Sequence, residues 1–193
     1  MKLGNYSITT KTLWLIAIVS LAVFFVSGRW HRTKVIDADV ISYYSYLPAA
    51  IIEGDLKMTY SVGNDFYADK VWGVIWKENS GPVQKYTMGL SWLYFPFFLL
   101  GHLSALIFGF PAHGYSGPYN FWLQMSAIFY LMLGFYWLRK VLLQYFSEAI
   151  SATVMLLLAF GTNLFYYTQG QATMPHVYLF ALVSGLLSVS YTH

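Results

Sequence analysis

Charged residues are very unevenly distributed along this chain of 193 residues. Seven of its eight acidic residues fall between residues 37 and 78, whereas Arg139 and Lys140 are the only basic residues from residue 86 to the end. Only 10% of the chain is charged, and a soluble domain carries about 25%, so the apolar remainder is too poor in charge to face water. We therefore expect a polytopic membrane protein in which one polar block interrupts a series of apolar spans.

The apolar runs set the expected organisation, which is a single membrane domain over residues 1–193. Its expected parts are a first span at 12–28, an outer loop at 29–87, an interfacial, re-entrant or spanning segment at 88–118, and further spans in 119–193. The expected fold class is all-α, a polytopic transmembrane helical bundle with an amphipathic, partly helical first outer loop. In that loop the apolar spacing indicates short helices along the membrane surface, and Gly54, Gly63 and Gly81 indicate turns.

The side of the membrane on which each later loop lies depends on residues 91–110, an apolar run interrupted by a proline and a Gly-His pair. If Lys2 and Lys11 lie inside, the first outer loop lies outside. If residues 91–110 then cross the bilayer, the next span returns the chain and Arg139 and Lys140 lie outside. If this segment stays at the outer interface, Arg139 and Lys140 lie inside, where basic residues are preferred. We favour the second arrangement, which places the polar loop 168–175 on the same side as the first outer loop. The further expected spans are the runs 121–138, 150–167 and 176–191.

Several classes of protein and site are excluded by what the sequence lacks. The chain has no cysteine, so it has neither disulfides nor thiolate metal sites. No basic cluster with interleaved aromatic residues is present, so nucleic acid is not an expected partner. Lys2 and Lys11 precede the first apolar run as in a signal peptide, but no small-residue cleavage site follows, and we interpret the run as a retained helix.

Two carboxylates, Asp37 and Asp39, follow the first span in the sequence IDADVISYY. Carboxylates beside a bilayer are costly unless they are solvated, paired or metal-bound. One interpretation is a general base that takes a proton from an acceptor hydroxyl, or a pair of oxygen ligands for a divalent cation. The alternative is a solvated loop in which Lys34 is the partner of these carboxylates, because the D-x-D pattern alone has low specificity.

Three further residues are candidates for binding phosphate or metal. Lys85 and Tyr86 end the polar block just before an apolar run, where a lysine can meet lipid phosphate or simply extend its amine towards water. His176 follows the polar loop at the start of the last apolar run, where a histidine is either a ligand or an ordinary interface residue. His102 and His113 are weaker candidates of the same kind.

The order of these features resembles the N-terminal half of the GT-C fold membrane glycosyltransferases, which include the protein O-mannosyltransferases and the aminoarabinose transferases of lipid A. The stretch DADVISYYSYLPAAIIEGDL is similar to their first outer loop, in which an acidic residue after the first helix is catalytic. QKYTMGL takes the place of a Lys-Pro-Pro-Leu stretch whose lysine faces the lipid phosphate, although the prolines are missing here. FYYTQGQATMPHV takes the place of a second outer loop, with His176 where relatives carry an acid.

The resemblance implies a glycosyltransferase that moves a sugar from a polyprenyl-phosphate donor to a glycan, lipid or protein acceptor on the outer face of a bacterial inner membrane. It implies Asp37 or Asp39 as the catalytic base, with Asp37 preferred because it comes first after the helix. The residues implied to bind the donor and its lipid phosphate are Lys85, Tyr43, Tyr86 and His176. A divalent metal cation held by Asp39 and His176 is the one cofactor implied. Because members of this family are much longer, we expect this chain to be an N-terminal portion.

Two other classes of protein remain open. A transporter or channel subunit would place ionisable groups within its spans, and the acids here cluster outside them. A structural or assembly protein of the membrane would need no chemistry in its outer loop. Replacement of Asp37 and Asp39 separates that class from an enzyme.

Overall fold

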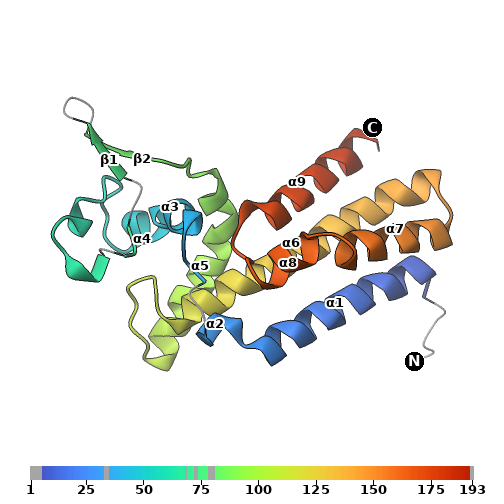
Figure 1. Ribbon diagram of the computed structural model, residues 1–193, viewed down its shortest axis with the longest axis horizontal. Helices are drawn as coiled ribbons and strands as arrows, with labels where there is room; N and C mark the ends of the chain where they lie inside the picture. The colour runs from blue at the N-terminus through green and yellow to red at the C-terminus, as the bar shows by residue number, and fades with distance from the viewer. Residues whose placement is uncertain (1–5, 33–34, 68, 72–73, 78–80, 192–193) are drawn as a thin grey trace. The chain divides into compact units, whose positions relative to one another are not determined.

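The computed structural model describes residues 6–32, 35–67, 69–71, 74–77 and 81–191. It is predominantly helical, which confirms the coarse fold class, and it divides into two compact units (Figure 1). The terminal unit comprises Met1–Arg29 and Ser126–His193, and the central unit comprises Trp30–Met125. Lys2 and Lys34, to which roles were assigned above, lie outside the described residues.

Within the described part of the chain, three helical segments are long and apolar enough to cross a membrane, namely Ile8–His31, Gly89–Phe108 and Gly117–Tyr145. The first contains α1 (Ile8–Ser27), which begins before the predicted residue 12 because the Ser7 hydroxyl accepts a hydrogen bond from the backbone N–H of Thr10. The helix ends at Gly28, whose φ of 53° is left-handed and whose N–H bonds to Phe24 O at 3.1 Å. The expectation of membrane-spanning helices is therefore supported by length and composition.

The apolar run 91–110, which the sequence shows interrupted, forms the continuous helix α5 (Gly89–Phe108) up to residue 108, and the helix runs through Pro96. Gly101 is a point of close contact with α6 (Gly117–Tyr145), because an added Cβ would lie 2.9 Å from Tyr119 Cα. The next residue, His102, shares a hydrogen bond of 2.6 Å between its Nδ1 and the Tyr119 hydroxyl. The Gly-His pair therefore joins two helices instead of breaking one. Whether α5 crosses the membrane stays a prediction.

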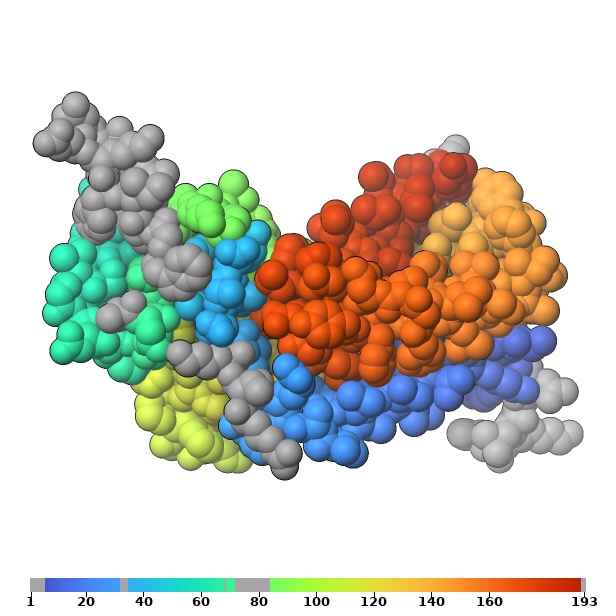
Figure 2. All heavy atoms as spheres, in the orientation of Figure 1, coloured from blue at the N-terminus to red at the C-terminus, as the bar shows by residue number. Residues whose placement is uncertain are grey.

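In the terminal unit, α7 (Glu148–Phe160), α8 (Leu164–Gln169) and α9 (Pro175–Ser190) follow α6. Helix α7 packs along α1, and the two form adjacent bands in Figures 1 and 2. The shared core contains the fully buried side chains of Ile16, Phe135, Met155 and Val177. Close packing of these side chains holds the helices together by van der Waals contact, and this core joins α1 to chain segments more than a hundred residues later.

The apolar run 150–167 forms two helices and not the single span predicted. The Thr162 hydroxyl donates to Leu158 O at 2.7 Å and accepts from the backbone N–H of Leu164 at 3.1 Å, so it satisfies both helix ends at the break. In α8 the Gln169 amide then donates to Ser20 O of α1 at 3.1 Å. These bonds turn the chain after only 13 residues of α7, fewer than the about 20 needed to span a bilayer.

A polar network joins the start of α1 to the start of α7 within the terminal unit. Thr9 is fully buried, and both its backbone N–H and its hydroxyl donate to Glu148 Oε2, at 2.9 and 2.7 Å. Arg139 Nε donates to Thr9 Oγ1 at 2.7 Å, and its Nη2 donates to Ser7 Oγ at 3.1 Å. Arg139 is thus part of a specific network in addition to marking the end of an apolar run.

The central unit contains short elements that connect α1 to α5. They are α2 (Arg29–Arg32), α3 (Asp39–Tyr44), α4 (Tyr46–Ile51), two 3₁₀ turns η1 (Thr59–Ser61) and η2 (Asp65–Tyr67), and strands β1 (Val74–Lys77) and β2 (Gly81–Gln84). The short helices predicted in this loop are confirmed, and Gly54 and Gly63 adopt the left-handed φ values of turns. The antiparallel hairpin, with Val74 opposite Gln84 and Lys77 opposite Gly81, was not predicted.

Aromatic side chains form the core of the central unit. Tyr44, Tyr94, Phe98 and Tyr119 are fully buried, and the ring centroids of Phe98 lie 5.9 Å from Tyr44 and 5.3 Å from Tyr119. The Tyr44 hydroxyl donates a hydrogen bond to Gly114 O. Part of the high aromatic content therefore serves packing as well as any membrane interface. This core fixes α3 against α5 and so positions the acidic turn that precedes α3.

Candidate functional site

The two candidate carboxylates occupy different positions in a tight turn. Asp39 is the first residue of α3 and is half-buried, whereas Asp37 lies before the helix and is exposed. The Asp37 carboxylate accepts a hydrogen bond from the backbone N–H of Ala38 at 2.9 Å, and Asp37 O accepts from Val40 N at 3.1 Å. Asp37 therefore stabilises the turn, and Asp39 begins the helix.

Ala38, between the two acids, has an unusual backbone conformation. Its φ of 48° and ψ of −134° lie in a region that glycine occupies readily and L-residues rarely occupy. Such a residue costs about 1–3 kcal/mol and persists only where its surroundings hold it. Here the bonds to Asp37 and the burial of Val40 hold it, so the turn that orients Asp39 is strained.

Asp39 lies in a cluster with Tyr43, Lys85 and Tyr86. The rings of Tyr43 and Tyr86 have centroids 4.7 Å apart, and Lys85 Nζ lies 4.9 Å from the centroid of the Tyr86 ring. The pKa of Lys85 is raised above its ordinary value, first by hydrogen bonding and charge interaction with Tyr86, and then by the Asp39 carboxylate. The pKa of Tyr43 is raised by partial burial and then by Tyr86 and Asp39. The raised pKa keeps the Lys85 side chain a cation, and this cation stacks on the Tyr86 ring.

Hydrogen bonds between distant parts of the central unit explain why the Lys85 segment lies near α3, within electrostatic range of Asp39. Gln84 Nε2 donates to Ser45 Oγ at 3.0 Å, and the Tyr46 hydroxyl donates to Tyr86 O at 2.7 Å. The Ser91 hydroxyl, at the start of α5, donates to Tyr43 O. Three bonds thus fasten the segment before α5 to α3 and α4, and four of the predicted site residues come together as a result.

Asp37 and His176 are not brought into this cluster by any described contact. His176 lies in the terminal unit, where its ring stacks on Tyr167 with centroids 3.6 Å apart and planes 10° apart. Asp39 lies in the central unit, so the metal site predicted from Asp39 and His176 combines residues of two separately described units and stays a prediction. Among the described residues, no three histidine, aspartate or glutamate side chains are grouped so that they could hold a metal ion.

A second polar cluster in the central unit was missed by the sequence reasoning. The Tyr67 hydroxyl donates to Glu53 Oε1 at 2.6 Å, and burial together with this bond raises the pKa of Tyr67 to about 12. The Tyr60 ring packs edge-on against Tyr67, and Tyr115 approaches it from the loop after α5. Burial also raises the pKa of Tyr115, whose hydroxyl donates to Lys70 O at 3.2 Å. These residues follow no helical or strand period, so no local pattern predicts that they meet.

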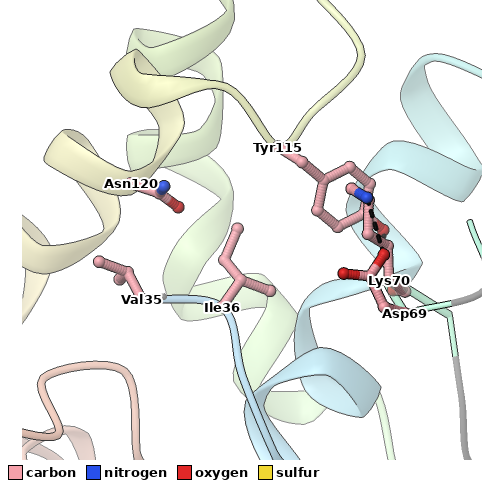
Figure 3. Close-up of a pocket in the computed structure, with 6 residues that line it drawn as sticks. All are labelled: Val35, Ile36, Asp69, Lys70, Tyr115 and Asn120. Atoms are coloured by element: carbon pink, nitrogen blue, oxygen red, sulfur yellow. Dashed lines mark hydrogen bonds and ion pairs between the residues drawn. The ribbon is translucent and has the colours of Figure 1, made fainter. Parts of the chain in front are cut away.

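Beside this cluster lies a cavity of about 260 Å³, shown in Figure 3. Its lining residues are Val35, Ile36, Asp69, Lys70, Tyr115 and Asn120. The Lys70 ammonium lies 2.8 Å from Asp69 Oδ1, donates to Phe66 O at 2.8 Å and lies 4.3 Å from the centroid of the Phe66 ring. The cavity therefore combines a carboxylate, an amide, an aromatic ring and aliphatic groups next to the turn that carries Asp37.

Comparisons with known proteins add no relative. No protein-family model matches the chain, and neither a curated protein nor a solved structure matches it. The resemblance to GT-C glycosyltransferases therefore depends on the residues quoted above, and the function is argued from the geometry of the central unit.

Proposed function

We propose that this chain is the N-terminal, membrane-embedded part of a glycosyltransferase that uses a polyprenyl-phosphate sugar as donor. The observation that carries the proposal is the packing of Tyr43, Tyr86 and Lys85, with the Asp39 carboxylate close enough to interact electrostatically with the Lys85 ammonium. Lys85 and Tyr86 directly precede α5, a helix long and apolar enough to cross a membrane. A base and a phosphate-binding cation at the end of such a helix suit a donor with a lipid tail and a charged head.

The chemistry follows from these two groups. Asp39 takes the proton of the acceptor hydroxyl, and the resulting oxygen forms a bond to the anomeric carbon of the sugar. The bond from that carbon to the phosphate oxygen breaks, and polyprenyl phosphate leaves with the bond's electron pair. The Lys85 ammonium stabilises the negative charge that develops on this phosphate. A metal ion bound by Asp39 would supply further charge stabilisation to the same phosphate.

Two observations support Asp39 as the base in preference to Asp37. Asp39 interacts electrostatically with Lys85 and is half-buried, so its proton transfer would occur beside the cation. Asp37 is exposed, and its carboxylate is occupied by the backbone N–H of Ala38. Asp37 then acts by holding the turn, and its loss should weaken catalysis less than the loss of Asp39.

An apolar cavity at the start of α5 supports a donor with a hydrocarbon tail. It has a volume of about 160 Å³. Its lining residues include Tyr46, Leu47, Met88, Ser91, Trp92 and Phe95. Tyr46 and Ser91 also make the hydrogen bonds that fasten the Lys85 segment. A lipid phosphate held by Lys85 would therefore have an apolar surface for its first isoprene units within the same unit.

The proposed location is a bacterial inner membrane, with the acidic loop on the outer face. This sidedness takes α5 to lie along the outer interface without crossing, so that Arg139 and Lys140 lie on the cytoplasmic side that basic residues prefer. Helices α7 and α8 together run beside α1 from Thr9, which bonds to Glu148, to Arg29, which donates to Gly170 O at 3.2 Å. They would return the chain to the outer face at the loop 168–175 and His176. The proposed acceptor is a hydroxyl of a glycan, lipid or protein.

Transfer measured in membranes containing the full-length protein tests this function. With a panel of radiolabelled polyprenyl-phosphate sugars, Asp39→Asn should lower the transfer rate by about 10²- to 10⁴-fold, the usual cost of losing a general base. Lys85→Met should raise the donor concentration needed for half-maximal rate by about tenfold or more, because a charge-assisted bond is lost. The matched control Asp65→Asn changes an exposed acid of the same unit outside the cluster. Wild-type rates in the Asp39→Asn and Lys85→Met proteins would refute the proposal.

A further inference from the structure

The cavity of Figure 3 has polar groups at two separated places and aliphatic groups between them. Asn120, in the first turns of α6, lies on one side of the view, while Asp69, Lys70 and Tyr115 lie on the other. Ile36, the residue before Asp37, projects into the space between these two groups. A ligand in this cavity would therefore contact hydrogen-bonding groups at its two ends and apolar surface along its face.

The charges of the cavity favour a neutral ligand. Lys70 is engaged by Asp69, by Phe66 O and by the Phe66 ring, so its charge is already compensated. The Asp69 carboxylate compensates that charge, so the pair offers no net positive charge to attract an anion such as a free phosphate, while the carboxylate is 56% exposed and within reach of a ligand hydroxyl. The Asn120 side chain has no hydrogen-bond partner among the described residues, and its amide offers both donors and an acceptor. Carboxylate and amide groups together match the hydroxyls of a neutral polyol.

The Tyr115 ring and the aliphatic side chains of the cavity favour a ligand that also has an apolar face. The Tyr115 hydroxyl already donates to Lys70 O, so its ring supplies mainly apolar contact. Together with Val35 and Ile36 it would suit the C–H face of a sugar ring, which linear polyols lack. The volume of about 260 Å³ is slightly below the roughly 300–1,000 Å³ of pockets for drug-sized ligands, and it suits a single ring better than an oligosaccharide.

From these features we infer that this cavity binds one monosaccharide unit, through hydrogen bonds from its hydroxyls to Asp69 and Asn120 and contact of its ring with Tyr115. The sugar would lie beside the turn that carries Asp37 and Asp39. Its role as the acceptor or the transferred unit rests on the proposed function, whereas its binding does not. The sugar has two sources, a free glycan end or a lipid-linked sugar, and both share this recognition chemistry.

The test is a binding measurement on the purified full chain in a phosphocholine detergent, because maltoside and glucoside detergents would themselves carry the proposed ligand. Saturation-transfer NMR would be recorded with methyl glycosides of glucose, galactose, mannose and xylose, and with octyl glucoside below its micellar concentration as the lipid-linked arm. Sugar–protein affinities near 1 mM correspond to only about −4 kcal/mol. We expect saturation transfer to at least one glycoside.

The variants then locate the binding. Asp69→Ala and Asn120→Ala should each weaken it by about tenfold to a hundredfold, because each removes a polar partner of a bound hydroxyl. Asp65→Asn, which alters an acid outside the lining, should leave it unchanged. Thermal unfolding of each variant would verify its fold, and if Asp69→Ala proved unfolded, Asp69→Asn would replace it, with the weakening expected from loss of the charge.

The outcomes separate the two proposals. Binding of methyl glycosides would identify a free glycan as the source, and binding of octyl glucoside alone would identify a lipid-linked sugar. The Asp39→Asn protein should still bind sugar, because Asp39 does not line the cavity, even if its transfer activity is lost. No saturation transfer to any glycoside, or binding unaffected by both alanine variants, would overturn the inference without bearing on transfer.

Discussion

Replacement of Ala38 by glycine should stabilise the protein, although glycine usually destabilises. Ala38 has a φ of 48° and a ψ of −134°, a conformation that costs an L-residue about 1–3 kcal/mol. Glycine adopts it without strain but loses about 0.5–1 kcal/mol more conformational entropy on folding. The difference leaves a net stabilisation of roughly 1 kcal/mol.

The measurement is the free energy of unfolding in mixed micelles with increasing SDS, followed by circular dichroism. The matched control is Ala49→Gly, a fully buried alanine within α4. That change should destabilise by roughly 2 kcal/mol, about 1 from helix propensity and about 0.8 from the lost buried methyl group. If Ala38→Gly destabilised the protein as Ala49→Gly does, the turn would not be strained and its role in orienting Asp39 would need another explanation.

Three further predictions concern other parts of the chain. Gly101→Ala should destabilise the protein by about 1–3 kcal/mol, because the new Cβ would lie 2.9 Å from a backbone atom of α6. The control Gly89→Ala has open space around its Cβ and should not destabilise the protein. Thermal unfolding of the two variants provides the comparison. Hydrogen bonds from Thr9 in α1 hold the pKa of Glu148 below its ordinary value of 4.5. The ionised group therefore stabilises the fold at pH values above 4.5. This stabilisation is lost as the pH falls through the lower pKa of the folded state. In the Glu148→Gln protein, the midpoint of unfolding should therefore depend less on pH below about 4.5 than in the wild type. An unchanged pH dependence would show that Glu148 is not its source. Cysteines introduced at Ser61 and Gln171 should both react with an impermeant reagent added outside intact cells, and labelling of Ser61 alone would contradict the proposed topology.

The features predicted from the sequence are those that depend on local composition. The first span and the span 121–138 follow from uninterrupted apolar runs. The structure contains α1 and α6 there, although α6 begins at Gly117 and continues past Arg139 to Tyr145. The turns at Gly54 and Gly63 follow from glycine's access to positive φ. The position of Asp37 and Asp39 in a loop after the first span was predicted, but the strained turn at Ala38 was not.

The features missed depend on contacts between distant residues. Gly101 and His102 looked like a helix interruption because their partner Tyr119 lies on the next helix. The break after α7 depends on the two hydrogen bonds of Thr162, which a hydropathy pattern does not register. Similarly, the position of Lys85 before an apolar run indicated its role. Its position relative to α3, however, depends on the hydrogen bonds that Ser45 and Tyr46 make with the neighbouring residues Gln84 and Tyr86.

The most direct test of the account is a double-mutant cycle between Asp39 and Lys85, measured as the transfer rate from a polyprenyl-phosphate sugar. Residues that act as a unit on one reaction show strongly non-additive losses. If the two residues serve one site, Asp39→Asn combined with Lys85→Met should lose little more activity than Asp39→Asn alone. Losses that simply multiply would contradict a shared site, and full activity in the double variant would contradict the enzymatic role of the cluster.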